Sequence, residues 1–104
     1  MTEQKEILSQ IKTAIQEVVP DAKVYLFGSR ARGDWHDESD WDILVLTEKK
    51  YPKAVKWQIH DKLFPLSVTL GTIFQLIITT KEEWENHPGY YVLQNTIQKE
   101  LLAL

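Results

Sequence analysis

Three short runs of β-branched and aromatic residues alternate with segments of helical periodicity, and this alternation limits the possible folds more than any other feature. The runs cover residues 23–27, 41–47 and 72–79. Regularly spaced apolar residues predict helices at 2–19, 49–63 and 90–104, and two short helices are expected at 29–32 and 81–85. Pro20, Gly33 and Pro65 serve as stop signals. This order predicts an α+β (mixed α/β) fold, with a small mixed sheet flanked by helices.

The size and composition predict one domain over residues 1–104. A net charge of −3 gives no field that would attract nucleic acid or an anionic membrane. The absence of cysteine excludes disulfides, thiolate zinc sites and cysteine nucleophiles. The longest near-apolar stretch, 66–78, is short and interrupted, and the first residues lack a secretion signal. We therefore expect a cytoplasmic protein without a membrane segment.

Gly28 and Ser29 stand where the first predicted strand turns into a short helix. Glycine lets the backbone approach a ligand closely, and the N–H groups that open a helix are free to bind an anion. Ser29 adds a hydroxyl donor and is the predicted cap of that helix, which Gly33 ends. The pair predicts a phosphate-binding corner, although an ordinary turn would have the same residues.

Asp40 and Asp42 lie at the start of the second predicted strand. Residues i and i+2 of a strand point to one face, about 6.6 Å apart along the backbone. Two such carboxylates repel each other unless a cation neutralises them, and their hard oxygen atoms favour Mg²⁺. Trp41, between them, is predicted to face the core. Ten residues separate Ser29 from Asp40, enough to bring the phosphate corner and the metal-binding pair side by side.

The segments Gly28-Ser29, Ala31-Arg32-Gly33 and Ser39-Asp40-Trp41-Asp42 resemble the signature of the polymerase-β-like nucleotidyltransferases, in their minimal (MNT) branch. The resemblance extends from the first helix to about Glu85. It implies a nucleotidyltransferase-like fold, Mg²⁺ as cofactor and a nucleoside triphosphate, with ATP favoured, as donor. It also implies that Gly28 and Ser29 bind the triphosphate and that Asp40 and Asp42 bind metal and act in catalysis.

One position departs from this family. The family has a third carboxylate on the next core strand, where it helps to bind metal and activates the acceptor hydroxyl. The position that we align with it is Gln75, whose amide cannot act as a general base. No Asp or Glu occurs between Lys62 and Lys81. The nearest acids are Asp61, Glu82 and Glu83, none of which is expected to reach the site.

Two arginines and a lysine cluster leave alternatives open. Arg30 and Arg32 suit the triphosphate or the neighbouring acids equally well, because a guanidinium pairs with both. The cluster is predicted to be a solvated helix face rather than a nucleic-acid contact; it comprises Lys49, Lys50, Lys53 and Lys56. The aromatic residues predicted to pack in the protein are Trp35, Trp57, Phe64, Phe74 and Trp84.

Two functions follow from these residues. The first is an enzyme that moves a nucleoside monophosphate to an acceptor hydroxyl, and the resemblance implies a helical HEPN-type partner, with this chain as the antitoxin of a toxin–antitoxin pair. The second is a catalytically impaired module that binds a nucleotide or partner through an apolar surface, expected at Tyr90, Tyr91, Leu102 and Leu104. A homo-oligomer is compatible with both. A nucleic-acid-binding domain is disfavoured because the chain lacks a basic stripe.

Overall fold

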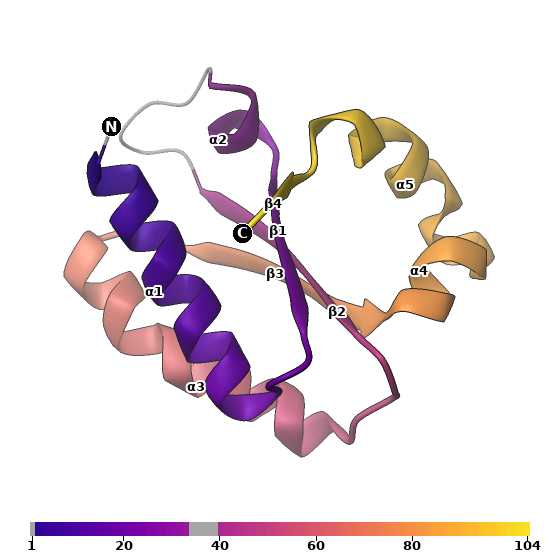
Figure 1. The fold of residues 1–104 in the computed structure, drawn as a ribbon, viewed down its shortest axis with the longest axis horizontal. Helices are drawn as coiled ribbons and strands as arrows, with labels where there is room; N and C mark the ends of the chain where they lie inside the picture. The colour runs from indigo at the N-terminus through magenta and orange to yellow at the C-terminus, as the bar shows by residue number, and fades with distance from the viewer. Residues whose placement is uncertain (1, 34–39) are drawn as a thin grey trace.

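The computed structural model describes residues 2–33 and 40–104, so Trp35 and Ser39 lie outside the described part of the chain. The described elements confirm a mixed α/β fold with helices around a small sheet (Figure 1). In chain order they are α1 (Thr2–Val18), β1 (Lys23–Phe27), α2 (Ser29–Arg32), β2 (Trp41–Thr47), α3 (Lys53–Leu70), β3 (Phe74–Thr80), α4 (Lys81–Asn86), the 3₁₀ turn η1 (Pro88–Tyr90), α5 (Tyr91–Ile97), the 3₁₀ turn η2 (Gln98–Glu100) and β4 (Leu102–Ala103).

The sheet has the strand order β3-β2-β1-β4 and is mixed. Strand β2 pairs antiparallel with β1 and parallel with β3, while β4 pairs antiparallel with β1 on its other side. The long α3 connects β2 to β3, as a parallel pair requires. Consequently the two central strands are β1, which ends just before Gly28, and β2, which begins beside the two aspartates.

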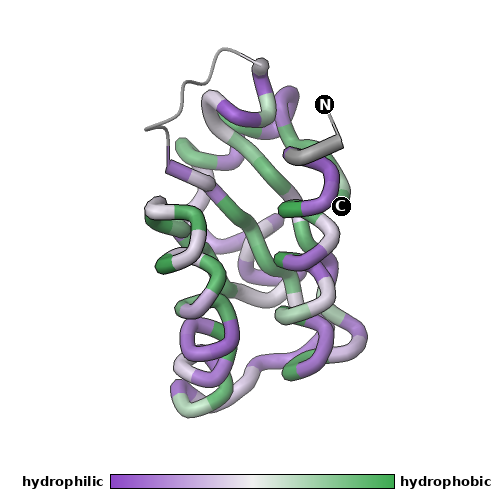
Figure 2. The backbone as a smooth tube through the Cα atoms, turned by 90° about the vertical axis from the view of Figure 1, so that its left-hand side faces the viewer, coloured by the Kyte–Doolittle hydropathy of each residue, from purple (hydrophilic) through white to green (hydrophobic). Residues whose placement is uncertain are grey.

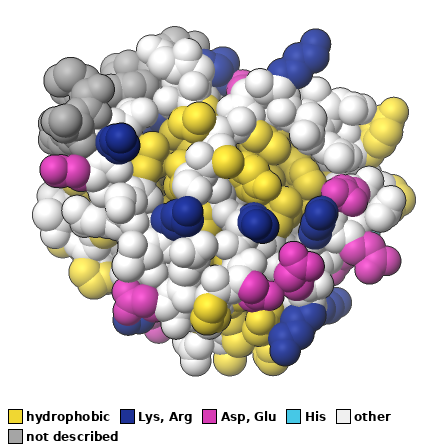
Figure 3. Space-filling view, in the orientation of Figure 1, with side chains coloured by type: hydrophobic (Ala, Val, Ile, Leu, Met, Phe, Trp, Pro, Cys, Tyr) yellow, Lys and Arg dark blue, Asp and Glu magenta, His cyan; other side chains and the backbone are white. Residues whose placement is uncertain are grey.

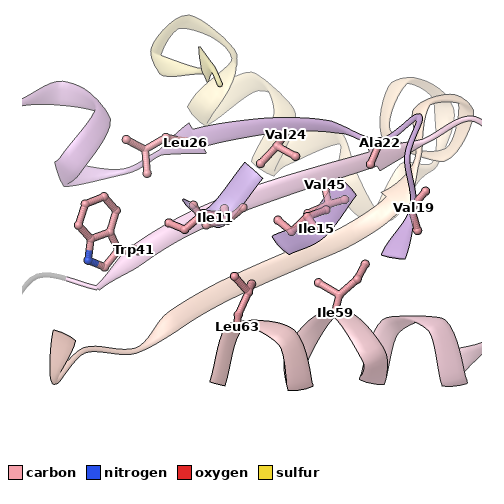
Figure 4. Packing of buried hydrophobic residues seen from close by; sticks show 11 residues of the cluster. Ile11, Ile15, Val19, Ala22, Val24, Leu26, Trp41, Val45, Ile59 and Leu63 are labelled. Atoms are coloured by element: carbon pink, nitrogen blue, oxygen red, sulfur yellow. The ribbon is translucent and has the colours of Figure 1, made fainter. Parts of the chain in front are cut away.

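Helices cover both faces of the sheet, and the alternation of strand residues decides which side chains meet them. Helices α1 and α3 cover one face, where a cluster of aliphatic residues and Trp41 is buried (Figure 4). Phe27, Leu44 and Leu46 pack on the opposite face with Trp84 of α4 and Ile97 of α5. Hydrophobic residues accordingly run along the central strands (Figure 2). Asp42 shares the face of Leu44 and Leu46, towards α4 and α5.

The prediction that Pro65 ends the third helix is wrong. Helix α3 continues through Pro65 to Leu70 and ends at Gly71, which has a left-handed φ of 64°. Leu66, beyond the proline, packs against the core. Proline breaks a helix by losing one hydrogen bond and crowding the preceding turn. Packing of the following turn on the sheet outweighs this cost here.

The prediction of one closing helix over 90–104 is also wrong. The chain forms η1, the two-turn α5 and η2, and then extends into β4. Residues Leu102 and Ala103 pair with Leu26 and Tyr25, and the Leu104 N–H donates to the Val24 carbonyl oxygen at 2.9 Å. The short helix α2 has its predicted bounds, but its N-cap is Gly28 rather than Ser29.

Two aromatic residues predicted to be buried are exposed instead. Trp57 and Phe64 on α3 are 65% and 66% exposed, whereas Trp84 is buried and Phe74 is partly buried against the core. The predicted apolar surface around residues 90–104 is only partly present, because Tyr91 and Leu102 are exposed while Tyr90 and Leu104 pack against the core clusters. None of the described helices is long and apolar enough to cross a membrane.

Candidate functional site

The Gly28 corner lies directly against the Asp42 carboxylate. Strands β1 and β2 pair with Phe27 opposite Asp42, so Gly28 leaves the sheet beside that aspartate. Gly28 has a φ of 77°, a conformation that side-chain-bearing residues rarely adopt. A Cβ atom at this position would overlap Oδ2 of Asp42. The close approach of backbone to carboxylate therefore requires glycine, and the two predicted motifs meet at one point.

Asp40 and Asp42 differ in burial. Asp40, just before β2, is exposed, whereas Asp42 is partly buried within the strand. Trp41 between them is 2% exposed, which confirms that it packs in the core. The Arg30 guanidinium carbon lies 4.0 Å from the centroid of the Trp41 ring, and the Arg30 side chain is itself buried. This cation–π contact connects α2 to Trp41, the residue between the two aspartates.

The Asp42 carboxyl sits where its charge is disfavoured. Burial raises its pKa above the ordinary value of 3.8, and the neighbouring Asp40 and Glu100 carboxylates raise it further, while Arg32 lowers it. Desolvation and like charges both penalise the ionised form. A divalent cation on Asp40 and Asp42 would relieve that penalty, so the donor set suits a hard metal ion. Among the residues that the structure describes, no three His, Cys, Asp or Glu side chains converge on a metal position.

Gln75, the residue that we aligned with the family's third carboxylate, lies on β3 beside the two aspartates. In the parallel pairing of β2 with β3, Gln75 is the residue opposite Asp42. Its amide Nε2 donates to Oδ2 of Asp40 at 3.4 Å. The other candidate acids are elsewhere: Glu82 and Glu83 follow the far end of β3, and Asp61 lies on an exposed turn of α3. The described site therefore has two carboxylates and an amide on neighbouring strands.

Glu100 also lies at this site, although no sequence motif indicated it. Its Oε1 accepts a hydrogen bond from the Gly28 N–H at 2.9 Å, and its Oε2 pairs with the Arg32 Nη1 at 3.0 Å. Figure 1 shows α2, the beginning of β2 and the segment entering β4 at the same end of the sheet. The contact joins residues 72 positions apart, and only the pairing of β4 with β1 could have revealed it.

The lysine cluster lies away from this site. Lys49 and Lys50 follow the end of β2, about 17 Å along the strand from Asp42. Lys53 and Lys56 begin α3, and most of the cluster is exposed to solvent. On the face that Figure 3 shows, Lys and Arg side chains are separated from one another by other groups. The prediction of a solvated helix face is consistent with this placement.

Comparison with known proteins points to one family. A model of the nucleotidyltransferase domain matches residues 8–100. The chain is 35% identical over 77 residues to "Putative protein adenylyltransferase MJ1379" of Methanocaldococcus jannaschii, covering 69% of this chain and 77% of the relative. It is 25% identical over 95 residues to "Putative protein adenylyltransferase MJ0604" of the same organism, covering 91% and 88%.

A shorter match connects the chain to a bacterial protein. It is 41% identical over 44 residues to "Probable protein adenylyltransferase MntA" of Haemophilus influenzae, which is 42% of this chain and 39% of that relative. This match, and a similar one to a further protein of Methanocaldococcus jannaschii, spans less than half of the relative's length.

Proposed function

Because the chain belongs to the nucleotidyltransferase domain family, we propose that it transfers an adenylyl group from Mg²⁺-bound ATP to a hydroxyl group of a protein. The names of its relatives support adenylyl transfer to protein. The reaction joins the acceptor oxygen to the α-phosphorus and breaks the bond from that phosphorus to the bridging oxygen. Pyrophosphate leaves, and the acceptor proton is released.

The proposal assigns the triphosphate to the Gly28 corner. The Gly28 backbone, the Ser29 hydroxyl and the Arg32 guanidinium would bind phosphate oxygens, and Asp40 and Asp42 would hold Mg²⁺. The metal ion, when bound, neutralises charge on the phosphates and aligns them for in-line displacement. Arg30 is buried on Trp41, so we give it a positioning role between α2 and the aspartates. Use of ATP agrees with the expected cytoplasmic location.

One observation carries the proposal: the Gly28 backbone and the Asp42 carboxylate are in such close contact that no side chain fits between them. A phosphate held at the corner would lie within reach of a cation held by the aspartates. Binding and charge neutralisation of a triphosphate then occur in one place, which is the arrangement that phosphoryl transfer needs.

The acceptor is proposed to be a second protein. Exposed apolar side chains, which suit a protein interface, occur on and after α3; they are Trp57, Phe64, Val68 and Ile73. A helical HEPN-type toxin is the partner that the family resemblance favours, with this chain as its antitoxin. Association of two copies of the chain is a second use of the same surface.

A second function is favoured by Gln75. Its amide occupies the position opposite Asp42 and cannot accept the acceptor proton. A chain with this residue can bind a metal-bound nucleotide and still lack turnover, acting as a noncatalytic partner or nucleotide sensor. The two functions share the binding site and differ in the chemical step.

Transfer of label from ATP to protein distinguishes them. The chain is incubated with Mg²⁺, ATP labelled at the α-phosphate and a candidate HEPN-type partner. If the partner becomes labelled, and the Asp40→Asn variant labels none, the chain is an enzyme. If the chain binds the nucleotide but transfers no label, it is a noncatalytic binding module. The Gln75→Asp variant should create or increase transfer if the missing carboxylate limits the reaction. Loss of transfer in that variant would show that Gln75 has its own role.

A further inference from the structure

We propose that Glu100 is an internal anion that occupies part of the triphosphate site and must be displaced when the nucleotide binds. The inference rests on the proposed function, since it concerns the same Gly28 corner. Glu100 comes from a distant part of the chain and sets how tightly that corner holds a phosphate. Glu100 is thus a determinant of affinity rather than a member of the reacting group.

The sheet register places Glu100 at this position. Strands β1 and β4 pair antiparallel, with Leu26 opposite Leu102. Gly28 directly follows β1, and Glu100 lies two residues before β4, so this pairing brings the two residues close together. The Oε1 atom of Glu100 then accepts the hydrogen bond of the Gly28 N–H at 2.9 Å. Pairing of Leu104 with Val24 holds the segment against β1.

The contacts of Glu100 are those that the proposal assigns to phosphate. One carboxylate oxygen accepts from the Gly28 N–H and the other pairs with the Arg32 guanidinium. The Glu100 side chain is 18% exposed, whereas that of Arg32 is 48% exposed, so the carboxylate is held well inside the contact. Backbone N–H groups and arginine bind carboxylate and phosphate oxygens through the same hydrogen bonds. The two anions therefore exclude each other.

The alternative role for Glu100 is that of the missing third carboxylate. It is near enough to Asp42 to raise the pKa of that group. Both of its oxygens, however, are engaged by donors, and the described acidic residues form no three-membered group around a metal position. The geometry favours a competitor for phosphate over a base.

Removal of the Glu100 charge should strengthen nucleotide binding. A protein whose binding-competent state is only partly populated has an apparent Kd raised by that fraction. We expect Glu100→Gln and Glu100→Ala to lower the Kd for ATP with Mg²⁺ by about tenfold, in isothermal titration calorimetry on the whole chain. Glu17→Gln is the matched control, because it removes the same charge from an exposed ion pair. Glu17 pairs with Lys62 at 3.1 Å and has no contact with the Gly28 corner. It should leave the Kd unchanged.

Each other outcome overturns the proposal. Equal tightening by Glu17→Gln would mean that only net charge matters. An unchanged Kd in both Glu100 variants would show that Glu100 does not compete. An unchanged Kd with loss of label transfer would make Glu100 a catalytic carboxylate. If neither the parent nor the variants bind ATP, the proposed function fails as well.

A measurement without nucleotide separates these failures. The amide resonance of Gly28 reports its hydrogen bond to Glu100 directly. Glu100→Gln should shift that resonance strongly in the nucleotide-free chain, while Glu17→Gln should not. A shift combined with normal ATP affinity would refute the competition and leave the proposed function intact. An unmoved Gly28 resonance would show that the contact is absent in solution and would also refute it.

Discussion

At the scale of residues, Asp42 has a carboxyl group whose ionised form the fold disfavours. Its carboxyl is partly buried beside Asp40 and Glu100, and burial is the main reason that its pKa is raised. A charge that the fold disfavours is one that a bound cation can stabilise. The ionised Asp42 carboxylate should therefore lower the free energy of unfolding of the metal-free protein, and a neutral side chain should restore it.

Asp42→Asn should stabilise the metal-free protein at pH 7. The folded pKa lies above the ordinary 3.8, so the folded chain binds this proton more tightly than the unfolded chain. The stability that protonated Asp42 contributes is therefore fully present below pH 3.8 and is lost as the pH rises through the folded pKa. At pH 7 the ionised carboxylate destabilises the fold, and the neutral amide of asparagine avoids this. The gain should be below about 1 kcal/mol, because water still reaches the side chain. It is measured as Tm against pH in the presence of a chelator.

The control for this prediction is Asp21→Asn. Asp21 is an exposed residue of the turn between α1 and β1, at the opposite end of β1 from Gly28. It should give no gain. A lower Tm for Asp42→Asn at pH 7 would contradict the account of Asp42.

Gly28→Ala and Gly33→Ala compare the glycine that lies against Asp42 with a glycine in an open turn. Both glycines have a left-handed φ, but a Cβ at Gly33 meets nothing within 4 Å, whereas one at Gly28 overlaps Asp42. Gly33→Ala should destabilise the fold by about 1 kcal/mol. Gly28→Ala should cost about 2–6 kcal/mol, because strain at its φ of 77° and ψ of −160° adds to the overlap with Asp42. Urea unfolding measures both. Equal losses in the two variants would show that Asp42 does not crowd Gly28.

At the scale of elements, helix α3 contains an interior proline that weakens its hydrogen bonding. Pro65 is exposed in the interior of the helix, where it lacks an N–H group for the ladder. Pro65→Ala should raise the free energy of unfolding by about 1–3 kcal/mol and leave nucleotide binding unchanged. Denaturant unfolding and calorimetry test the two parts. No gain in stability would mean that the helix has fully adapted to the proline.

The elements differ in how well the sequence predicts them. The bounds predicted for β1, α2 and β2 agree with the structure, because a compact apolar run or a glycine marks each end. Pro65 misled the prediction because a local stop signal cannot show that Leu66 has a core to pack against. The two-residue β4 has no periodicity of its own and forms only because β1 offers an open edge.

At the scale of the whole molecule, the site joins segments from four parts of the chain: the Gly28 corner, the two aspartates, Gln75 and Glu100. The Gly28 corner and the aspartates could be predicted because both motifs are local and lie on neighbouring strands. Glu100 could not, since its place depends on the register of β4. Exposure of Trp57 and Phe64 was also unpredictable, because helix periodicity does not tell which apolar positions the sheet covers.

This arrangement predicts binding of ATP that depends on a divalent cation and on both aspartates together. The most direct measurement is calorimetric titration of ATP into the chain, with Mg²⁺ and with a chelator, for the parent and for the Asp40→Asn, Asp42→Asn double variant. We expect binding by the parent with Mg²⁺ only, and none by the double variant. Binding that survives both the chelator and the loss of the aspartates, or no binding under any condition, would contradict a shared site for metal and triphosphate.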